Sequence, residues 1–305
     1  MGHHDHKANA REGNRRALAV VLILTSSFTV VEIIGGILTG SLALLADAGH
    51  MLSDNFSLGV ALFAAWLAGR PATPEKSFGY RRAEILAALA NGMTLVAISV
   101  WIFIEAYTRL REPAEVLGGP MLVVATLGLL VNVAGAAILY RSGGDSLNVE
   151  GAMRHVLADA LGSAGAMAAA ATIILTGWRY ADPLISVAIG LLILGSSWKL
   201  LRDSTNILLE ATPRGLNAGE VGQKMAAADG IVEVHDLHIW TITSGFPALS
   251  AHVLVGKHED CHARRRELEE FLTSEYGISH TTLQVDHVGD HYTSLRTLRF
   301  PSRLD

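Results

Sequence analysis

The sequence has little of what most enzymes and secreted proteins depend on. Its 305 residues include one cysteine, Cys261, which excludes an internal disulfide and a cysteine-rich zinc site. No glycine-rich phosphate loop, nucleophile elbow or His-Glu-x-x-His motif occurs in it, so no enzyme is predicted. Charged residues make up only 17% of the chain, and the net charge of −5 gives no reason to expect a nucleic-acid partner.

The chain instead has long apolar runs. Half of its residues are hydrophobic, and the runs before residue 205 are long enough to cross a bilayer, which takes about 20 residues of helix. The predicted spans are residues 17–38, 42–67, 84–107, 120–140, 151–176 and 183–201. No cleavable signal peptide is evident, because the polar start is followed by a run long enough to span. Six spans place both termini on one side of the membrane.

Basic residues indicate which side that is. Most of the lysines and arginines near the span ends lie in the N-terminal tail, in the 68–82 loop and beyond the sixth span. Arg109, Arg111 and Arg179 lie on the other side. The positive-inside rule therefore makes both termini cytoplasmic. The compact loops and short tails fit a bacterial inner membrane.

Two of the predicted spans each carry a histidine and an aspartate four residues apart, and ionisable side chains are costly in lipid and usually functional. His50 and Asp54 are four residues apart and share a helix face, and His155 and Asp159 repeat this spacing. Two imidazoles and two carboxylates suit tetrahedral zinc, and the two carboxylates cancel the charge of the ion. An empty site would leave them uncompensated, which invites protonation. The pattern predicts a transported divalent ion and protons as its counter-ion.

Other roles for the polar groups in these spans stay open. The four side chains could form a buried network that joins helices, although four ionisable groups are a costly means to that end. Asp47, three residues before His50, could be an accessory metal ligand, shape the exit or relay protons. Asn91 and Asn132 are better explained as interhelical hydrogen bonds than as ligands.

From about residue 203 the sequence changes to that of a small soluble domain. Helices are predicted at 217–228 and 260–276, and strands at 231–243, 248–256 and 281–288. The order α-β-β-α-β indicates an α+β sandwich with helices on one face of an antiparallel sheet.

Four motifs together resemble the cation diffusion facilitator family, its zinc-exporter branch in particular. They are SLALLADAGHMLSD at 41–54, FGYRRAEILAALANG at 78–92, HVLADALGS at 155–163 and HDLHIW at 235–240. The resemblance implies a homodimer, each protomer having six transmembrane helices and a C-terminal α+β ferredoxin-like cytoplasmic domain. It implies proton-coupled efflux of zinc by alternating access, with the transport site on His50, Asp54, His155 and Asp159. A histidine at the first ligand position is associated in this family with zinc over cadmium.

The resemblance also divides the chain and implies further sites. The predicted parts are a cytoplasmic tail (1–16), a transmembrane domain (17–205), a cytoplasmic metal-binding and dimerisation domain (206–290) and a C-terminal tail (291–305). A tentative regulatory zinc site in the cytoplasmic domain falls on His235, His252 and Asp286. A structural salt bridge is implied between Arg82 and Glu210.

Some features depart from the family pattern. Gln284 stands where a histidine is common, which weakens the cytoplasmic site, although His238 or His287 could substitute. The 69–82 loop has no histidine, so no further metal site is predicted there. The loop RSGGDSLNVE at 141–150 is too short for metal delivery.

Two other functions remain compatible with the residues. One is a membrane-anchored divalent-metal sensor. The other is the same transporter with Co²⁺, Ni²⁺, Fe²⁺, Mn²⁺ or Cd²⁺ as its main substrate, since a site of two histidines and two aspartates does not exclude these ions.

Overall fold

The computed structural model describes residues 2–141, 147–288 and 299–301. The chain divides into two compact units, one of Met1–Ala61 and Ala90–Leu200 and the other of Leu62–Leu89 and Leu201–Asp305. Part of the predicted 141–150 loop (142–146) and most of the predicted C-terminal tail (291–298 and 302–305) lie outside the described residues.

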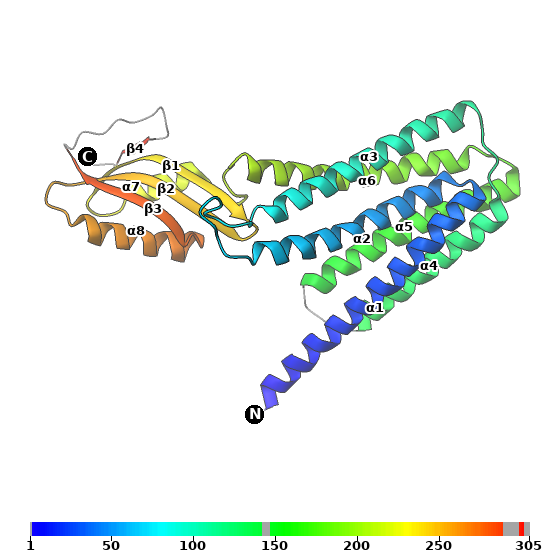
Figure 1. Ribbon diagram of the computed structural model, residues 1–305, viewed down its shortest axis with the longest axis horizontal. Helices are drawn as coiled ribbons and strands as arrows, with labels where there is room; N and C mark the ends of the chain where they lie inside the picture. The colour runs from blue at the N-terminus through cyan, green and yellow to red at the C-terminus, as the bar shows by residue number, and fades with distance from the viewer. Residues whose placement is uncertain (1, 142–146, 289–298, 302–305) are drawn as a thin grey trace. The chain divides into compact units, whose positions relative to one another are not determined.

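Six helices in the described part of the chain are long and apolar enough to cross a membrane (Figure 1). They are α1 (Gly2–Thr39), α2 (Leu42–Ala68), α3 (Ala83–Arg111), α4 (Gly118–Arg141), α5 (Leu147–Thr176) and α6 (Ala181–Leu208). The six predicted spans are thereby confirmed as helices. Helix α1 begins at Gly2, so residues 2–16 of the predicted N-terminal tail form its first turns.

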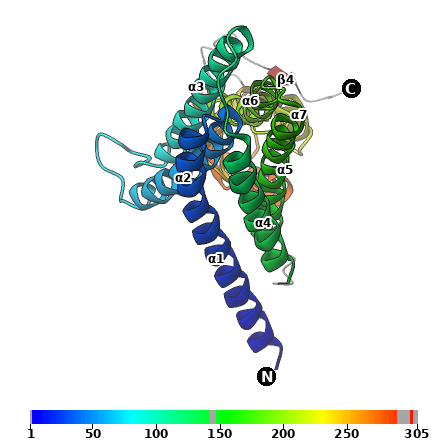
Figure 2. The ribbon, with the colours of Figure 1, turned by 90° about the vertical axis from the view of Figure 1, so that its right-hand side faces the viewer.

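Small residues allow close packing within the first unit. There α4 packs against α5, and α1 packs along α4 (Figure 2). Alanines contribute much of the buried core, among them Ala43 and Ala46 of α2 and Ala166 and Ala170 of α5. Without bulky side chains at these positions, the helix backbones approach closely, as is typical of helices in lipid.

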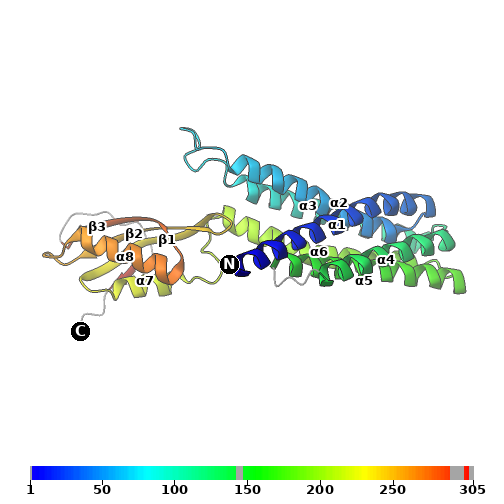
Figure 3. The same ribbon diagram turned by 90° about the horizontal axis from the view of Figure 1, so that it is seen from below.

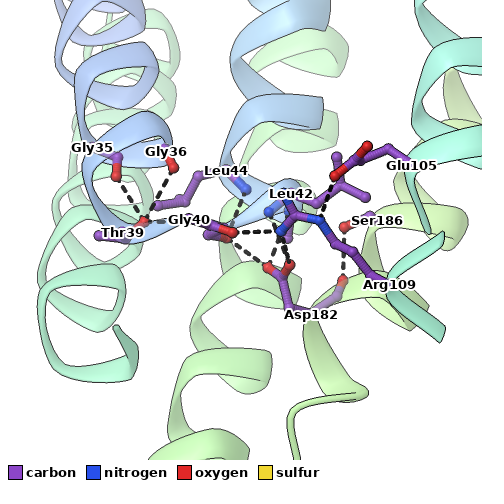
Figure 4. A network of polar contacts seen from close by, with 12 residues as sticks. Gly35, Gly36, Thr39, Gly40, Leu42, Leu44, Glu105, Arg109, Asp182 and Ser186 are labelled. Atoms are coloured by element: carbon purple, nitrogen blue, oxygen red, sulfur yellow. Dashed lines mark hydrogen bonds and ion pairs between the residues drawn. The ribbon is translucent and has the colours of Figure 1, made fainter. Parts of the chain in front are cut away.

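Asp182 joins the first turn of α6 to the start of α2 (Figure 4). Its fully buried carboxylate accepts hydrogen bonds from the Ser41 hydroxyl at 2.6 Å and from the backbone N–H groups of Leu42 at 2.8 Å and Ala43 at 3.2 Å. These are N–H groups that a helix start leaves unpaired, so Asp182 caps α2 from another helix.

Arg109 of α3 completes this Asp182 network. Its guanidinium lies 3.4 Å from the Asp182 carboxylate and donates to the backbone oxygen of Gly40, and its Nε donates to Glu105 at 2.9 Å. Gly40 has a φ of +68°, the left-handed conformation that the tight turn between α1 and α2 requires. The network therefore fixes the point at which α2 begins.

The second unit contains a four-stranded sheet in the order β3-β2-β1-β4. Its elements are α7 (Ala218–Ala226), β1 (Ile231–Thr243), β2 (Phe246–Val255), α8 (Cys261–Tyr276), β3 (His280–His287) and β4 (Arg299–Pro301). The five predicted elements are confirmed, but the prediction of an antiparallel sheet is wrong. Strands β2 and β3 run parallel, because α8 returns the chain to the same end of the sheet before β3 begins.

One face of the sheet is covered by helices. Figure 3 shows α8 lying across the strands. Leu268 and Leu272 of α8 share a core with Ala251 and Val253 of β2 and with Met225 of α7. Because side chains alternate along a strand, His252, which lies between Ala251 and Val253, faces away from the helices.

Capping residues define the ends of α8. The carboxylate of Asp260 accepts hydrogen bonds from the backbone N–H groups of His262 and Ala263. The bond from Ala263 and then that from His262 lower the pKa of Asp260 below its usual value. Gly277 ends the helix with a φ of +67°.

Asp182→Ala should destabilise the protein strongly. The substitution leaves Arg109 and two backbone N–H groups without their shared buried acceptor, a loss of about 3 kcal/mol. Thermal unfolding in detergent should show a lower Tm than the wild type. Glu115→Ala is the control, because its ion pair with Arg179 is exposed and should hardly affect the Tm. Equal Tm values for Asp182→Ala and the wild type would contradict a stabilising role of the network.

Candidate metal centre

Four side chains from α2 and α5 converge inside the first unit. The Asp54 carboxylate lies 3.4 Å from His50 Nε2 on its own helix and 3.5 Å from His155 Nε2 on the other. His155 Nε2 also lies 3.5 Å from the Asp159 carboxylate. The structure thus brings together all four residues that the two spacings single out.

The four side chains sit at different depths. The Asp159 side chain is almost fully buried, with 1% of its surface exposed, whereas that of His155 is 43% exposed. His50 and Asp54 lie between these extremes, at 20% and 27%. Potential ligands therefore line the path from an accessible imidazole to a buried carboxylate.

Several of these polar atoms make no hydrogen bond in the described part of the chain. Neither carboxylate oxygen of Asp159 makes a hydrogen bond within the described residues, and the same holds for Nδ1 of His50. An unsatisfied buried acceptor costs about 1–3 kcal/mol, and more when it is charged. One potential ligand atom from each of His50, His155 and Asp159 lies within 4.8 Å of the other two, so a single cation could satisfy them.

The four residues line a cavity of about 470 Å³. Its wall also includes Asn91 and Leu95 of α3 and Ile189, Ile193, Ser196 and Leu200 of α6. Asn91 accepts a hydrogen bond from Ser53, the residue before Asp54, at 2.9 Å. This bond joins α3 to α2 beside Asp54, in agreement with the prediction that Asn91 bonds between helices.

Asp47 lines the same cavity as the four potential ligands. Its carboxylate accepts a hydrogen bond from Ser163 of α5 at 3.3 Å and is buried. A side chain at Gly162 would lie 2.5 Å from it, so α5 can pass Asp47 only with a glycine there. Asp47 is absent from the sets of described side chains that could share one metal ion, and its role as an accessory ligand stays a prediction.

A second set of potential metal ligands lies in the sheet. His235 of β1 pairs directly with His252 of β2, and their rings are 5.3 Å apart. Asp236 supplies the carboxylate of this set, with ligand atoms within 4.8 Å of one another. The Asp236 carboxylate lies 3.9 Å from His252 Nδ1.

The other residues considered for that site are placed differently. Asp286 accepts a hydrogen bond from Gln284 at 2.8 Å and does not belong to the set. His287 contacts the backbone oxygen of Glu259 at 3.0 Å and the Cys261 thiol. His238 shares with His252 and Gln284 a cavity of about 360 Å³.

A bulge in β1 explains why the sequence did not point to Asp236. The pairing shifts between His235 and His238, and Asp236 has a φ of +51°, unusual for a residue other than glycine. In a regular strand Asp236 and His235 would face opposite sides. The HDLHIW motif contained the residue, but nothing in it signalled the bulge.

The implied pairing of Arg82 with Glu210 is present within the second unit. The two side chains form an ion pair at 2.9 Å. Two neighbouring contacts are a hydrogen bond from Thr243 to Glu84 at 2.8 Å and the packing of the Arg81 guanidinium over the Phe246 ring. The polar loop after α2 is thereby joined to β1 and β2.

Membrane-length helices around a candidate divalent-metal site, followed by an α+β domain, define the class of membrane metal-cation transporters. The family model for the cation efflux transmembrane domain matches residues 18–209, and that for the cation efflux protein cytoplasmic domain matches residues 213–288. The chain belongs to the cation diffusion facilitator family. Its members are transporters, so the chain is not an enzyme.

Characterised relatives align along almost the whole chain. It is 44% identical to the cadmium, cobalt and zinc/H(+)-K(+) antiporter of Bacillus subtilis, over 94% of this chain and 92% of that protein. It is 42% identical to the metal cation efflux system protein CzcD of Cupriavidus metallidurans, over 93% and 90%. It is 40% identical to the zinc transporter ZitB of Escherichia coli, over 95% and 94%.

Measured zinc affinities should show whether Asp236 or Asp286 is the carboxylate ligand in the sheet. In a full-length Asp54→Asn background, which removes one of the four potential ligands on α2 and α5, Asp236→Asn should weaken zinc binding at the sheet at least tenfold. Asp286→Asn should change it less than twofold, because Asp286 lies outside the ligand set. Isothermal titration with ZnCl₂ measures both. The reverse order would show that Asp286 is the ligand after all.

Proposed function

We propose that this protein exports Zn²⁺ from the cytoplasm in exchange for protons, by alternating access at His50, Asp54, His155 and Asp159. The observation that carries the proposal is the convergence of these four side chains on one cavity. Their chemistry supports it, because two imidazoles and two carboxylates match zinc in ligand type and number. Two carboxylates also neutralise the ion while it crosses the hydrocarbon region.

Proton coupling follows from the same atoms. Metal binding requires neutral imidazoles and ionised carboxylates, so protons and zinc compete for the site. Histidine suits this exchange because its unperturbed pKa of about 6.5 is close to physiological pH. The B. subtilis relative is named as a proton-coupled antiporter, which supports the same coupling here.

The cavity supports loading from the cytoplasm. Its α6 residues, Ile189, Ile193, Ser196 and Leu200, are spaced by about one helical turn and lead toward the C-terminal end of α6. The positive-inside rule assigns that end, together with both chain termini, to the cytoplasm. The exposed His155 would meet the ion first, and the buried Asp159 would hold it deepest.

Zinc is the ion we assign, with related divalent ions as alternatives. Relatives are named for zinc alone or for cadmium, cobalt and zinc. His50 favours zinc over cadmium in this family, and the softness of its nitrogen ligand suits zinc, cobalt and nickel alike. The membrane we assign is the bacterial inner membrane.

The cytoplasmic domain would act as a dimerisation and regulatory module. The family model that matches it is named for dimerisation, which supports a homodimer. Zinc at His235, Asp236 and His252, with Asp286 as the alternative carboxylate, would bias the transport cycle through linkage. The Arg82–Glu210 pair would join this domain to the loop after α2. We retain 17–205 and 206–290 as the bounds of the two domains.

Zinc flux into proteoliposomes that contain a pH dye tests this function. The wild type should take up zinc and move protons the opposite way. Asp54→Asn and Asp159→Asn, which keep side-chain size but remove charge, should reduce both signals at least tenfold. Glu150→Gln is the matched control, because it makes the same change on α5 at an exposed ion pair.

Two other outcomes of the flux experiment would change the proposed function. Zinc binding without flux in the wild type would replace the transporter by a membrane-anchored sensor. Flux that survives both aspartate substitutions would show that the four-residue site is not the transport site.

A further inference from the structure

A second polar cluster lies beside the four-residue site and is not explained by zinc binding. It consists of Glu32 of α1, Asp47 of α2, Asn132 of α4 and Ser163 of α5, and we call it the Glu32 cluster. The Asn132 amide donates to the Ser163 hydroxyl at 3.4 Å, and this hydroxyl donates to the Asp47 carboxylate at 3.3 Å. The carboxyl groups of Glu32 and Asp47 face each other.

The two carboxyl groups are buried without a compensating cation. Glu32 is 0% exposed and Asp47 is 2% exposed. Within the described residues, no lysine, arginine or histidine forms an ion pair with either of them. Asp159 on α5 adds a further negative charge nearby. An uncompensated pair of carboxylates in hydrocarbon is too costly to persist, so the pair must hold a proton or a bound cation.

Asn132 gives independent evidence for a ligand. It is fully buried, and its amide nitrogen is directed at Ser163, which places the amide group at the cluster. Its carbonyl oxygen makes no hydrogen bond in the part of the chain that the structure describes. A buried amide oxygen usually has a donor or a cation as its partner.

The two helices that supply neutral oxygens are shaped to reach the carboxylates. A Cβ at Gly128 of α4 would lie 2.9 Å from the Ser163 hydroxyl and 2.8 Å from the Phe28 ring. A Cβ at Gly162 of α5 would lie 2.5 Å from the Asp47 carboxylate. These two glycines let α4 and α5 bring their oxygen atoms against α1 and α2.

We propose that the Glu32 cluster is a separate site for a further counter-ion of transport, which binds in addition to the protons that compete with zinc at the four-residue site. This counter-ion is a hard monovalent cation, either a proton or an alkali-metal ion. All of its potential ligand atoms are oxygens of carboxylate, amide and hydroxyl groups. Such a set suits a hard cation and lacks the nitrogen ligands of the four-residue site. The inference rests on the proposed function, since a counter-ion presupposes transport.

The cluster shares both of its inner helices with the zinc ligands. Ser163 follows Asp159 by four residues on α5, and Asp47 precedes His50 by three on α2. A cation that draws Asp47 and Ser163 together would shift the same two helices that hold the zinc. The two sites would then be linked in free energy, so that filling one changes the affinity of the other.

Imposed ion gradients test the counter-ion site. Zinc flux into proteoliposomes is measured under a gradient of protons, of K⁺ or of Na⁺, each at a clamped membrane potential. Zinc flux through the wild type should rise under a gradient of the ion that binds the Glu32 cluster, and that ion is identified as the one whose effect Glu32→Gln removes. Glu32→Gln should reduce this acceleration at least tenfold. The variant should still bind zinc at the four-residue site, because Glu32 is not a zinc ligand, but its zinc affinity should no longer depend on the concentration of the counter-ion.

Two matched serine substitutions provide a second test of the cluster in case Glu32→Gln misfolds. Ser163→Ala removes one oxygen from the cluster and should weaken the gradient response about threefold or more. Ser99→Ala makes the same change at a serine that is also buried. Its hydroxyl donates to the backbone oxygen of Leu95 at 2.9 Å within α3, so this variant should respond like the wild type. If Glu32→Gln elutes as aggregate, the comparison of the two serine variants decides.

Two results would overturn the counter-ion site. One is a wild-type response in both Glu32→Gln and Ser163→Ala. The other is wild-type zinc flux that ignores all three gradients. Failure of the zinc site itself is recognised separately, because flux would then survive Asp54→Asn.

Discussion

A charge inside a bilayer must be compensated, and the first unit of this protein meets that requirement in three ways. Asp182 is compensated within the fold, by Arg109 and by the backbone N–H groups at the start of α2. Asp54 and Asp159 face imidazoles that can carry a proton or share a metal ion with them. Glu32 faces the carboxyl group of Asp47, and no cationic side chain in the described part of the chain forms an ion pair with either of them. The first arrangement is permanent, whereas the other two depend on what binds.

This difference suggests how binding could become movement. A helix pair whose charges are neutralised only by a bound ion has different stable positions when loaded and when empty. Helices α2 and α5 carry both conditional sites, and α2 is anchored at one end by the permanent Asp182 network. Small residues, such as Gly162, let α5 lie close against its neighbours, so that a change of charge on one helix is felt by the next. Under the proposed function, zinc and its counter-ion would each favour one arrangement of the same helices.

The sequence predicted what depends on local spacing and missed what depends on contacts distant in the chain. Apolar runs gave the six spans, and the repeated i, i+4 pattern singled out His50, Asp54, His155 and Asp159, although their ligand role stays a prediction. The antiparallel sheet was wrong, because the crossover through α8 sets the direction of β3 and no local pattern encodes it. Strand β4 lay in what was read as a tail. The position of Asp236 depends on a bulge, and the capping by Asp182 joins residues about 140 positions apart.

The most direct test of the central claim is a cryo-electron microscopy map of the zinc-loaded protein in lipid nanodiscs, compared with a map after chelation. The account predicts zinc-dependent density bounded by His50, Asp54, His155 and Asp159, at about 2.0–2.2 Å from their nitrogen and oxygen atoms. Zinc-dependent density at the Glu32 cluster, with none among these four residues, would contradict it.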